Sequence, residues 1–191
     1  IAYGLPIHLP MVDVRTVGAG GGSIAWIDRG GMLRVGPESA GSAPGPICYG
    51  RGGTRPTVTD ANLLLGRLDP DALLATGRRV TVEEVRDAFA REIGDPLGMT
   101  PEQAAEAVIR LANVLMAGAI RMVSLSRGHD PRDFALFAFG GAGPVHAYGV
   151  ARILKLPKIV YPFGAGVMSA AGFLTAPLAF IGSSKDPVLR E

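Results

Sequence analysis

The chain has 191 residues, of which 48% are hydrophobic and 6% aromatic, and its formal net charge is +2. So small a charge excludes a strongly basic surface for nucleic acid, and no nucleic-acid partner is expected. The single cysteine, Cys48, excludes an internal disulfide and fits a reducing compartment, so a cytoplasmic location is expected.

One long stretch without charge, residues 159–182, raises the question of a membrane-spanning helix. Prolines and glycines interrupt it, and no cluster of basic residues flanks it, so a buried strand followed by a packed helix is favoured and no membrane partner is expected. The chain begins within an apolar phrase and ends on a charged one, and it is expected to be a piece of a longer protein.

The first distinctive segment is VGAGGGSIA at 17–25, with apolar alternation on both sides. We expect strands at 11–17 and 22–28 with the glycines at the corner between them, and a third strand at 31–35. A two-residue turn needs one or two glycines, whereas this segment has four, at positions 18, 20, 21 and 22. Successive N–H groups in a glycine turn form an anion site, so the segment predicts a phosphate-binding corner. A plain tight hairpin is the alternative.

Residues 36–57 show neither a helical nor a strand period. A loop of this length in a compact domain is usually functional or disordered. Because it carries Cys48 and Tyr49 among glycines and prolines, and few charges, we interpret it as an ordered active-site loop. A flexible linker is the alternative. Cys48 has no close basic neighbour and is interpreted as a small buried residue rather than a nucleophile.

Three helix starts follow. Thr57 to Asp60 begins a short helix that ends near Gly66, and Thr81 to Glu84 forms a capping box. Thr100 to Gln103 forms another, with proline at the first helical position. The helix that it opens is expected to run to about Arg127 with Gly128 as its stop, and its many alanines make it the central packing helix. Residues 81–127 are thus a helical part of the domain.

The C-terminal third alternates strands and helices. FALFAF at 134–139 is typical of a strand buried on both faces, and a helix at 145–154, a strand at 158–161 and a small-residue helix near 164–172 follow. Strand, helix and strand in this order predict a parallel α/β unit.

Two glycine segments are candidates for ligand binding. The first formally matches the dinucleotide pattern G-x-G-x-x-A at 20–25, but a strand rather than a helix follows it. The second comprises Gly140, Gly141, Ala142, Gly143 and Pro144 between a strand and a helix. There His146 occupies the third glycine position and no acidic residue closes a following strand. The backbone of this turn could still carry a base or ribose; a tight structural turn is the alternative, and a dinucleotide-dependent oxidoreductase ranks last.

The titratable residues give weaker signals. The three histidines, at positions 8, 129 and 146, show no ligand spacing, so they predict no metal site. Asp13, just before the glycine corner, and Asp60, just after the long loop, are the candidate catalytic carboxylates. Asp60 could instead cap a helix, and Asp13 could be the polar side of a strand.

Four segments together resemble the hydantoinase A / 5-oxoprolinase family, to which the beta subunits of acetone carboxylase also belong. They read GAGGGSIA at 18–25, VGPESAGSAPGPICYGRGG at 35–53, PTVTDANLLLGRL at 56–68 and FGGAGPVHA at 139–147. The resemblance implies an α/β, actin-like (ribonuclease H-like) ATPase lobe in one domain spanning 1–191. Gly18, Gly20, Gly21, Gly22 and Ser23 would form its second phosphate loop, and residues 139–144 would contact adenosine.

The resemblance also implies a reaction. ATP, with Mg²⁺ or Mn²⁺, would phosphorylate the carbonyl oxygen of a cyclic amide such as hydantoin or 5-oxoproline, which activates it for ring-opening hydrolysis. A hydantoinase B-like subunit or domain would complete the reaction. The first phosphate loop has no counterpart here, so this chain would be the second lobe and would need a missing N-terminal lobe. An ATP-dependent ketone carboxylase and a non-catalytic nucleotide-binding module are the alternatives.

Overall fold

The computed structural model describes residues 14–72 and 78–177, so Asp13 and the first part of the expected strand at 11–17 lie outside the described residues. The described helices and strands, in chain order, are β1 (Ser23–Ile27), β2 (Leu33–Ser39), α1 (Val58–Leu64), α2 (Val82–Phe89), α3 (Asp95–Leu97), α4 (Pro101–Leu125), β3 (Ala135–Phe137), α5 (Gly143–Leu154), β4 (Lys158–Val160) and α6 (Met168–Thr175).

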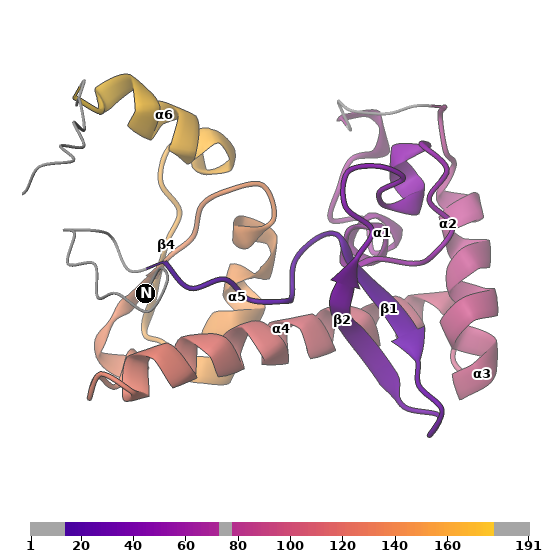
Figure 1. Cartoon of the computed structure of the whole chain (residues 1–191), viewed down its shortest axis with the longest axis horizontal. Helices are drawn as coiled ribbons and strands as arrows, with labels where there is room; N and C mark the ends of the chain where they lie inside the picture. The colour runs from indigo at the N-terminus through magenta and orange to yellow at the C-terminus, as the bar shows by residue number, and fades with distance from the viewer. Residues whose placement is uncertain (1–13, 73–77, 178–191) are drawn as a thin grey trace, which may run out of the picture.

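Helix α4 is the element that joins the rest (Figure 1). The hairpin β1–β2 and helices α1 to α3 lie toward one end of it, and α5, β4 and α6 lie toward the other. The core is divided in the same way. A large cluster includes Val58, Val85, Phe89 and Val108, and a smaller one joins Ala117 of α4 to α5. The long helix therefore carries both parts of the core.

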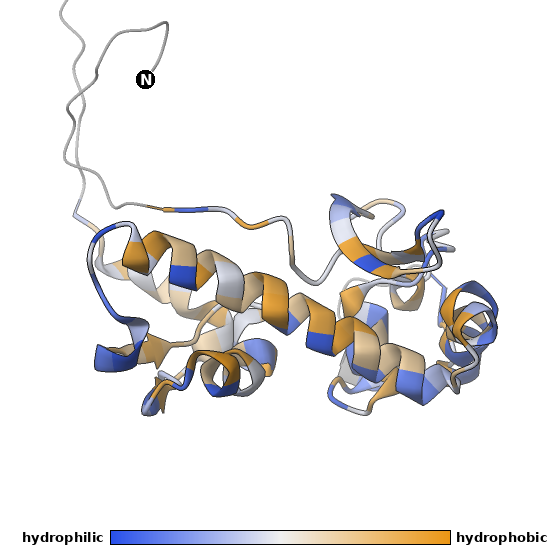
Figure 2. Ribbon diagram, turned by 90° about the horizontal axis from the view of Figure 1, so that it is seen from below, coloured by the Kyte–Doolittle hydropathy of each residue, from blue (hydrophilic) through white to orange (hydrophobic). Residues whose placement is uncertain are grey.

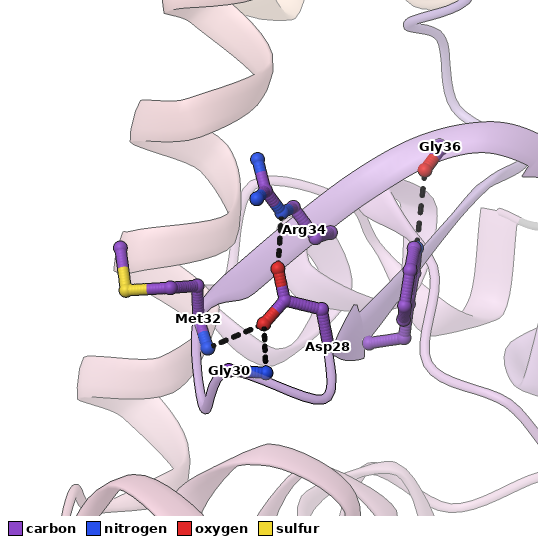
Figure 3. A network of polar contacts seen from close by, with 6 residues as sticks. Asp28, Gly30, Met32, Arg34 and Gly36 are labelled. Atoms are coloured by element: carbon purple, nitrogen blue, oxygen red, sulfur yellow. Dashed lines mark hydrogen bonds and ion pairs between the residues drawn. The ribbon is translucent and has the colours of Figure 1, made fainter.

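The pair β1–β2 corresponds to the strands expected at 22–28 and 31–35, whereas the strand expected before them at 11–17 differs. The strands are antiparallel, but residues 14–17 are not in a strand, and the glycine run leads into β1 instead of joining two strands. The hairpin corner lies at 28–32, where one oxygen of Asp28 accepts the N–H groups of Gly30 and Met32 and the other pairs with Arg34 (Figure 3). This turn has glycines of its own, Gly30 and Gly31, the second with φ of +76°, so it does not use the glycines at 18–22. The glycines at positions 18, 20, 21 and 22 are therefore not needed for the hairpin and are available to bind a ligand.

The helices begin where their caps were expected. Thr57, Thr81 and Thr100 each accept the backbone N–H three residues ahead, and the side chain of that residue reaches back to the threonine N–H. After α2 a π-helical turn at Ala90–Gly94 leads into α3, which ends at Gly98 with a left-handed conformation. Residues 36–57 are more structured than expected, because β2 extends to Ser39 and a 3₁₀ turn spans Ile47–Tyr49.

The pair β3–β4 is parallel, with α5 as the connection, as the strand–helix–strand pattern predicts. However, β3 is not buried on both faces. Phe137 is 48% exposed, and Phe139, just beyond the strand, is 49% exposed. A two-stranded sheet with one covering helix cannot bury both of its faces, so this apolar strand is half open among the described residues.

By length and apolar composition alone, α4 could cross a membrane. Such a helix is weak evidence for a span, because core helices pass the same test. Figure 2 shows polar and apolar residues interleaved along α4. Its buried positions, among them Ala104, Ala105, Val108 and Ala112, belong to the larger core cluster. The part of α4 up to Ala117 therefore packs as a core helix does, whereas its C-terminal end leaves apolar side chains such as Met122 and Leu125 exposed.

Candidate functional site

The two glycine segments, more than a hundred residues apart, meet at one cavity of about 380 Å³. Ala19 and Gly20 line it from the first segment, and Ala142 and Gly143 line it from the second. The remaining wall is mostly apolar and comes from α4, the β3 region and α5: Val17, Met116, Ile120, Leu136, Phe137, Ala138, Phe139, His146, Ala147 and Val150. A concave, largely apolar pocket beside exposed backbone is the usual form of a small-ligand site.

The backbone of the first segment is fixed by its carbonyl groups. The carbonyl of Gly21 accepts the N–H of Thr59 at 2.8 Å, and that of Gly22 accepts the N–H of Ala40 at 2.8 Å. The N–H groups of Gly21 and Gly22 donate to no acceptor in the described part of the chain. The carbonyl groups of Gly21 and Gly22 are thus held by the protein, while their N–H groups remain available as donors. An anion binds to such a set of free backbone N–H groups.

Gly21 also lies at a point of close approach. A Cβ at this position would lie 2.7 Å from Thr59 Oγ1 and 3.9 Å from the Cβ of Ala142. The first distance is far below a normal contact, so a larger residue would have to displace the Thr59 hydroxyl at the start of α1. The second places Gly21 beside the other glycine segment, although neither Gly21 nor Gly22 lines the cavity itself.

Ser23 supports the turn from inside. Its buried hydroxyl accepts the N–H of Gly20 at 2.9 Å, and its own N–H donates to the Gly20 carbonyl at 3.0 Å. Gly18 lies against β2, because a Cβ on Gly36 would come within 2.5 Å of the Gly18 carbonyl oxygen. In this structure Ser23 therefore shapes the turn, with its side chain engaged by the backbone.

The second segment forms the entrance to α5. Gly140 has φ of +88° and donates its N–H to the carbonyl of Ala165. No side chain caps α5 at Ala142, no acidic residue stands in its first turn, and Pro144 is in that turn. The N-terminal end of a helix carries a partial positive charge and free N–H groups, which suit a negatively charged ligand.

Asp60 is buried and has a structural part. Its Oδ2 accepts the N–H of Thr57, the hydroxyl of Thr57 and the N–H of Ile47, and its Oδ1 accepts the N–H of Cys48. The alternative interpretation of this residue, a helix cap, is confirmed. Asp60 also does not line the cavity, so a catalytic part for it stays an untested prediction, as does one for Asp13.

Cys48 is buried, as expected. Burial, together with the charge of nearby Asp60, raises the pKa of its thiol far above the ordinary value. A thiol that stays protonated is a poor nucleophile. Residues 36–57 contact the first glycine segment through Ala40 and Gly36 but do not line the cavity, so their part in an active site stays a prediction.

His146 links the cavity to the core. It is 2% exposed, its Nδ1 lies 2.7 Å from Asn113 Oδ1, and its Nε2 lies 3.4 Å from Asn62 Nδ2. Asn62 Nδ2 also lies 3.1 Å from the Val58 carbonyl, which can only accept, and Asn62 Oδ1 lies near Arg67, which can only donate.

These fixed partners determine the proton on His146. Asn62 must point its amide nitrogen at Nε2, so Nε2 accepts and the proton is on Nδ1, which donates to Asn113. The imidazole is thus neutral. Burial and then the charge of Arg67 lower its pKa, which agrees with that assignment. In the sequence His146 stands at a glycine position of the dinucleotide pattern and is one of three histidines without ligand spacing; its partners come from α1 and α4 and have no local signal.

No group of three or more histidine, cysteine, aspartate or glutamate side chains within residues 14–72 and 78–177 could hold a metal ion.

The apolar wall that α4 and the β3 region contribute to the cavity was not predicted from the sequence. Alanine-rich helical spacing indicates that a helix packs closely, but it does not indicate which face borders a ligand.

Comparison with known proteins identifies relatives that match nearly the whole of this chain. A family model described as hydantoinase/oxoprolinase matches residues 1–181. The alpha subunit of caprolactamase from Pseudomonas jessenii is 47% identical over 174 residues, which is 91% of this chain and 25% of that protein. The 5-oxoprolinase of Dictyostelium discoideum is 37% identical over 190 residues, 92% of this chain and 15% of that protein.

Solved structures agree with the sequence matches. The crystal structure of the ATP-dependent caprolactamase from Pseudomonas jessenii superposes with a TM-score of 0.78 at 49% identity, covering 87% of this chain and 24% of that one. A nucleotide-free structure of acetone carboxylase gives 0.72 at 34% identity, covering 81% and 22%. The chain thus spans about a quarter or less of the relatives it matches.

Proposed function

We propose that this chain, which belongs to the hydantoinase/oxoprolinase family, forms one side of the ATP site of an enzyme that opens cyclic amides. The observation that carries the proposal is the meeting of the two glycine segments at one cavity, with unused N–H groups beside an uncapped helix end. The N–H groups of Gly21 and Gly22 would donate to phosphate oxygens, and the apolar wall near Phe139 would accept the base.

Family relatives narrow the substrate class. The neighbours carry the names caprolactamase and 5-oxoprolinase, and both names describe cyclic amides. ATP would supply the phosphoryl group that activates the amide carbonyl, a reaction in which the protein acts chiefly by positioning and charge stabilisation. Mg²⁺ or Mn²⁺ would supply positive charge that stabilises the phosphates during the transfer. We assign it no ligand in this chain, because the described residues contain no cluster of metal-ligating side chains.

A ketone carboxylase is the second candidate, because acetone carboxylase shares the fold at 34% identity. The higher identity to caprolactamase, 49%, favours the cyclic amide. Within either enzyme we propose that the chain is the second lobe of an actin-like ATPase, located in the cytoplasm and acting with a hydantoinase B-like subunit. The cytoplasmic location is supported by the free, buried thiol of Cys48.

The exposed apolar side chains around β3 and α6 support the need for a further lobe. Phe137 and Phe139 are half exposed, while Phe163, Phe173 and Leu174 are almost fully exposed. Large exposed apolar groups that lie close together usually mark an interaction surface. We propose that the missing N-terminal lobe covers them and contributes the first phosphate loop.

Calorimetry with ATP and with NAD, on the chain alone and with the missing lobe added, tests the nucleotide assignment. ATP binding that strengthens when the lobe is added is expected; binding of NAD without ATP would refute the proposal. ATP hydrolysis that depends on a lactam, hydantoin or 5-oxoproline, rather than on acetone, would distinguish the two enzyme classes once the hydantoinase B-like partner is present.

Gly21→Val tests the phosphate loop. A side chain here would collide with Thr59 Oγ1, so loss of ATP binding is expected in the complete enzyme. Gly118→Val on α4 is the matched control, because no atom lies within 4 Å of a Cβ at that glycine. Wild-type ATP affinity in the Gly21 variant would show that the phosphate lies elsewhere.

A further inference from the structure

A second cavity, of about 490 Å³, lies between α4, α5 and the turn that follows α1. It shares no lining residue with the cavity between the glycine segments. Whereas that cavity is mostly apolar, this one is lined by three arginines, Arg67, Arg110 and Arg152, together with Glu106 and Asn113. Its chemistry is therefore different and the proposed nucleotide site does not use it.

The arginines leave an excess of positive charge. They come from three elements, and none of them pairs with a carboxylate in the part of the chain that the structure describes. Arg67 has a 3.4 Å contact with the Asn62 amide oxygen, and Arg152 lies over the ring of Tyr148 at 5.8 Å. Glu106 is the one acidic residue of the cavity lining, so positive charge exceeds negative.

Asn113 is the buried part of this cavity. The residue is 9% exposed, and its Oδ1 accepts the Nδ1 proton of His146. Its Nδ2 has no hydrogen-bond partner among the described residues, although an amide nitrogen carries two protons. This nitrogen lies at the bare face of Gly149, another lining residue, where a Cβ would come within 2.2 Å of it.

Gly149 explains why the nitrogen is reachable. Glycine inside a helix is unfavourable relative to alanine, so its presence in the middle of α5 calls for a reason. Here the missing side chain leaves room for the Asn113 amide at the cavity wall. A donor nitrogen on a side chain that is only 9% exposed, open to a cavity lined by guanidinium groups and without a protein partner among the described residues, suits a ligand that only accepts hydrogen bonds.

We propose that this second cavity binds a small oxyanion, a carboxylate or a phosphate group. Asn113 Nδ2 would donate to it from the floor, while Arg110 and Arg152 would neutralise its charge from α4 and α5. Arginine suits both groups because its planar fork donates two parallel hydrogen bonds. Asn113 Oδ1 also accepts a hydrogen bond from His146, which lines the nucleotide cavity. An anion bound to Asn113 Nδ2 would therefore act on a residue of the nucleotide cavity through the Asn113 side chain.

Selective labelling makes the test direct, because the chain has two asparagines, Asn62 and Asn113. Asparagine labelled with ¹⁵N in its side chain gives two pairs of amide signals, one pair for each residue, which are followed by NMR while inorganic phosphate or acetate is added. Sodium chloride at matched ionic strength is the control. We expect the Asn113 signal to shift and saturate with at least one of the two anions. The anion with the lower dissociation constant shows whether the site prefers phosphate or carboxylate.

Paired variants on α4 separate a site from general attraction. Arg110→Gln removes a guanidinium from the cavity, and Arg121→Gln makes the same change on the same helix outside it. We expect the first to weaken binding by at least about tenfold and the second by less than about twofold. Arg152→Gln should act like Arg110→Gln, and circular dichroism checks that each variant is folded.

Three results would overturn the proposal. The first is a shift that does not saturate or that chloride reproduces. The second is equal weakening in the Arg110 and Arg121 variants, which would indicate long-range charge attraction. The third is a shift of the Asn62 signal with no change at Asn113, which would place the anion elsewhere.

Discussion

Asp60→Asn is the substitution that best separates a structural from a catalytic carboxylate. In the native chain the two oxygens of Asp60 accept four hydrogen bonds, one at Oδ1 and three at Oδ2. Asparagine has the same shape, but one of its two terminal groups is a donor. The arrangement that loses least keeps the amide oxygen at the Oδ2 position, and places the NH₂ group opposite the N–H of Cys48.

That arrangement sets the expected magnitude. The charge-assisted bond from Cys48, 2.8 Å long, is lost, and its N–H is left buried without an acceptor. A lost bond to a charged group together with an unsatisfied buried donor is worth about 2–4 kcal/mol of unfolding free energy. The three remaining bonds are also weaker, because their acceptor is no longer charged. Asp60→Ala would leave all four donors unsatisfied and should be more damaging still.

Urea unfolding followed by circular dichroism measures this loss. Asp87→Asn, at an exposed position on α2, is the matched control and should change the unfolding free energy by less than about 0.5 kcal/mol. If Asp60→Asn were as stable as the control while ATP turnover in the complete enzyme was lost, the capping argument would be refuted. The catalytic interpretation of Asp60 would then be favoured.

Three further predictions concern buried groups. The thiol of Cys48, with its raised pKa, should react with iodoacetamide at least about tenfold more slowly in the native chain than in urea; equal rates would contradict its burial. Because the folded pKa of His146 lies below its ordinary value of 6.5, unfolding free energy should fall as pH decreases through that value, as the unfolded chain binds the proton first. His146→Gln should remove this part of the pH dependence and His129→Gln should retain it. Gly149→Ala should destabilise by about 1–3 kcal/mol through its clash with Asn113, whereas Gly118→Ala, facing open space, should stabilise by about 0.5–1 kcal/mol; thermal denaturation compares the two.

Much of the secondary structure was predictable because its causes are local. The capping boxes at Thr57, Thr81 and Thr100 each join residues three apart, so the pattern contains all the partners. The same holds for the parallel β3–β4 unit, whose order follows from the alternation of strand and helix. The family, too, was identified from motifs that are contiguous in the chain.

The sequence was misleading where a segment depends on distant contacts. The alternation at 11–17 predicted a strand, yet residues 14–17 pair with no strand in the described chain, and the observed hairpin is the one between the strands expected at 22–28 and 31–35. FALFAF at 134–139 predicted burial on both faces, but half of that burial would have to come from outside the described residues. An apolar sequence indicates that a face of the strand is to be buried, but it does not indicate which other segment buries it.

The sequence by itself therefore determined the helix starts, the glycine segments and the family. Only the tertiary structure brought Gly21 within reach of Ala142, linked His146 to Asn113 and Asn62, and grouped three arginines around the Asn113 amide. The physical reason is the range of the interactions. A cap or a turn is complete within four residues, whereas a cavity and the protonation of a buried histidine depend on side chains delivered by separate helices.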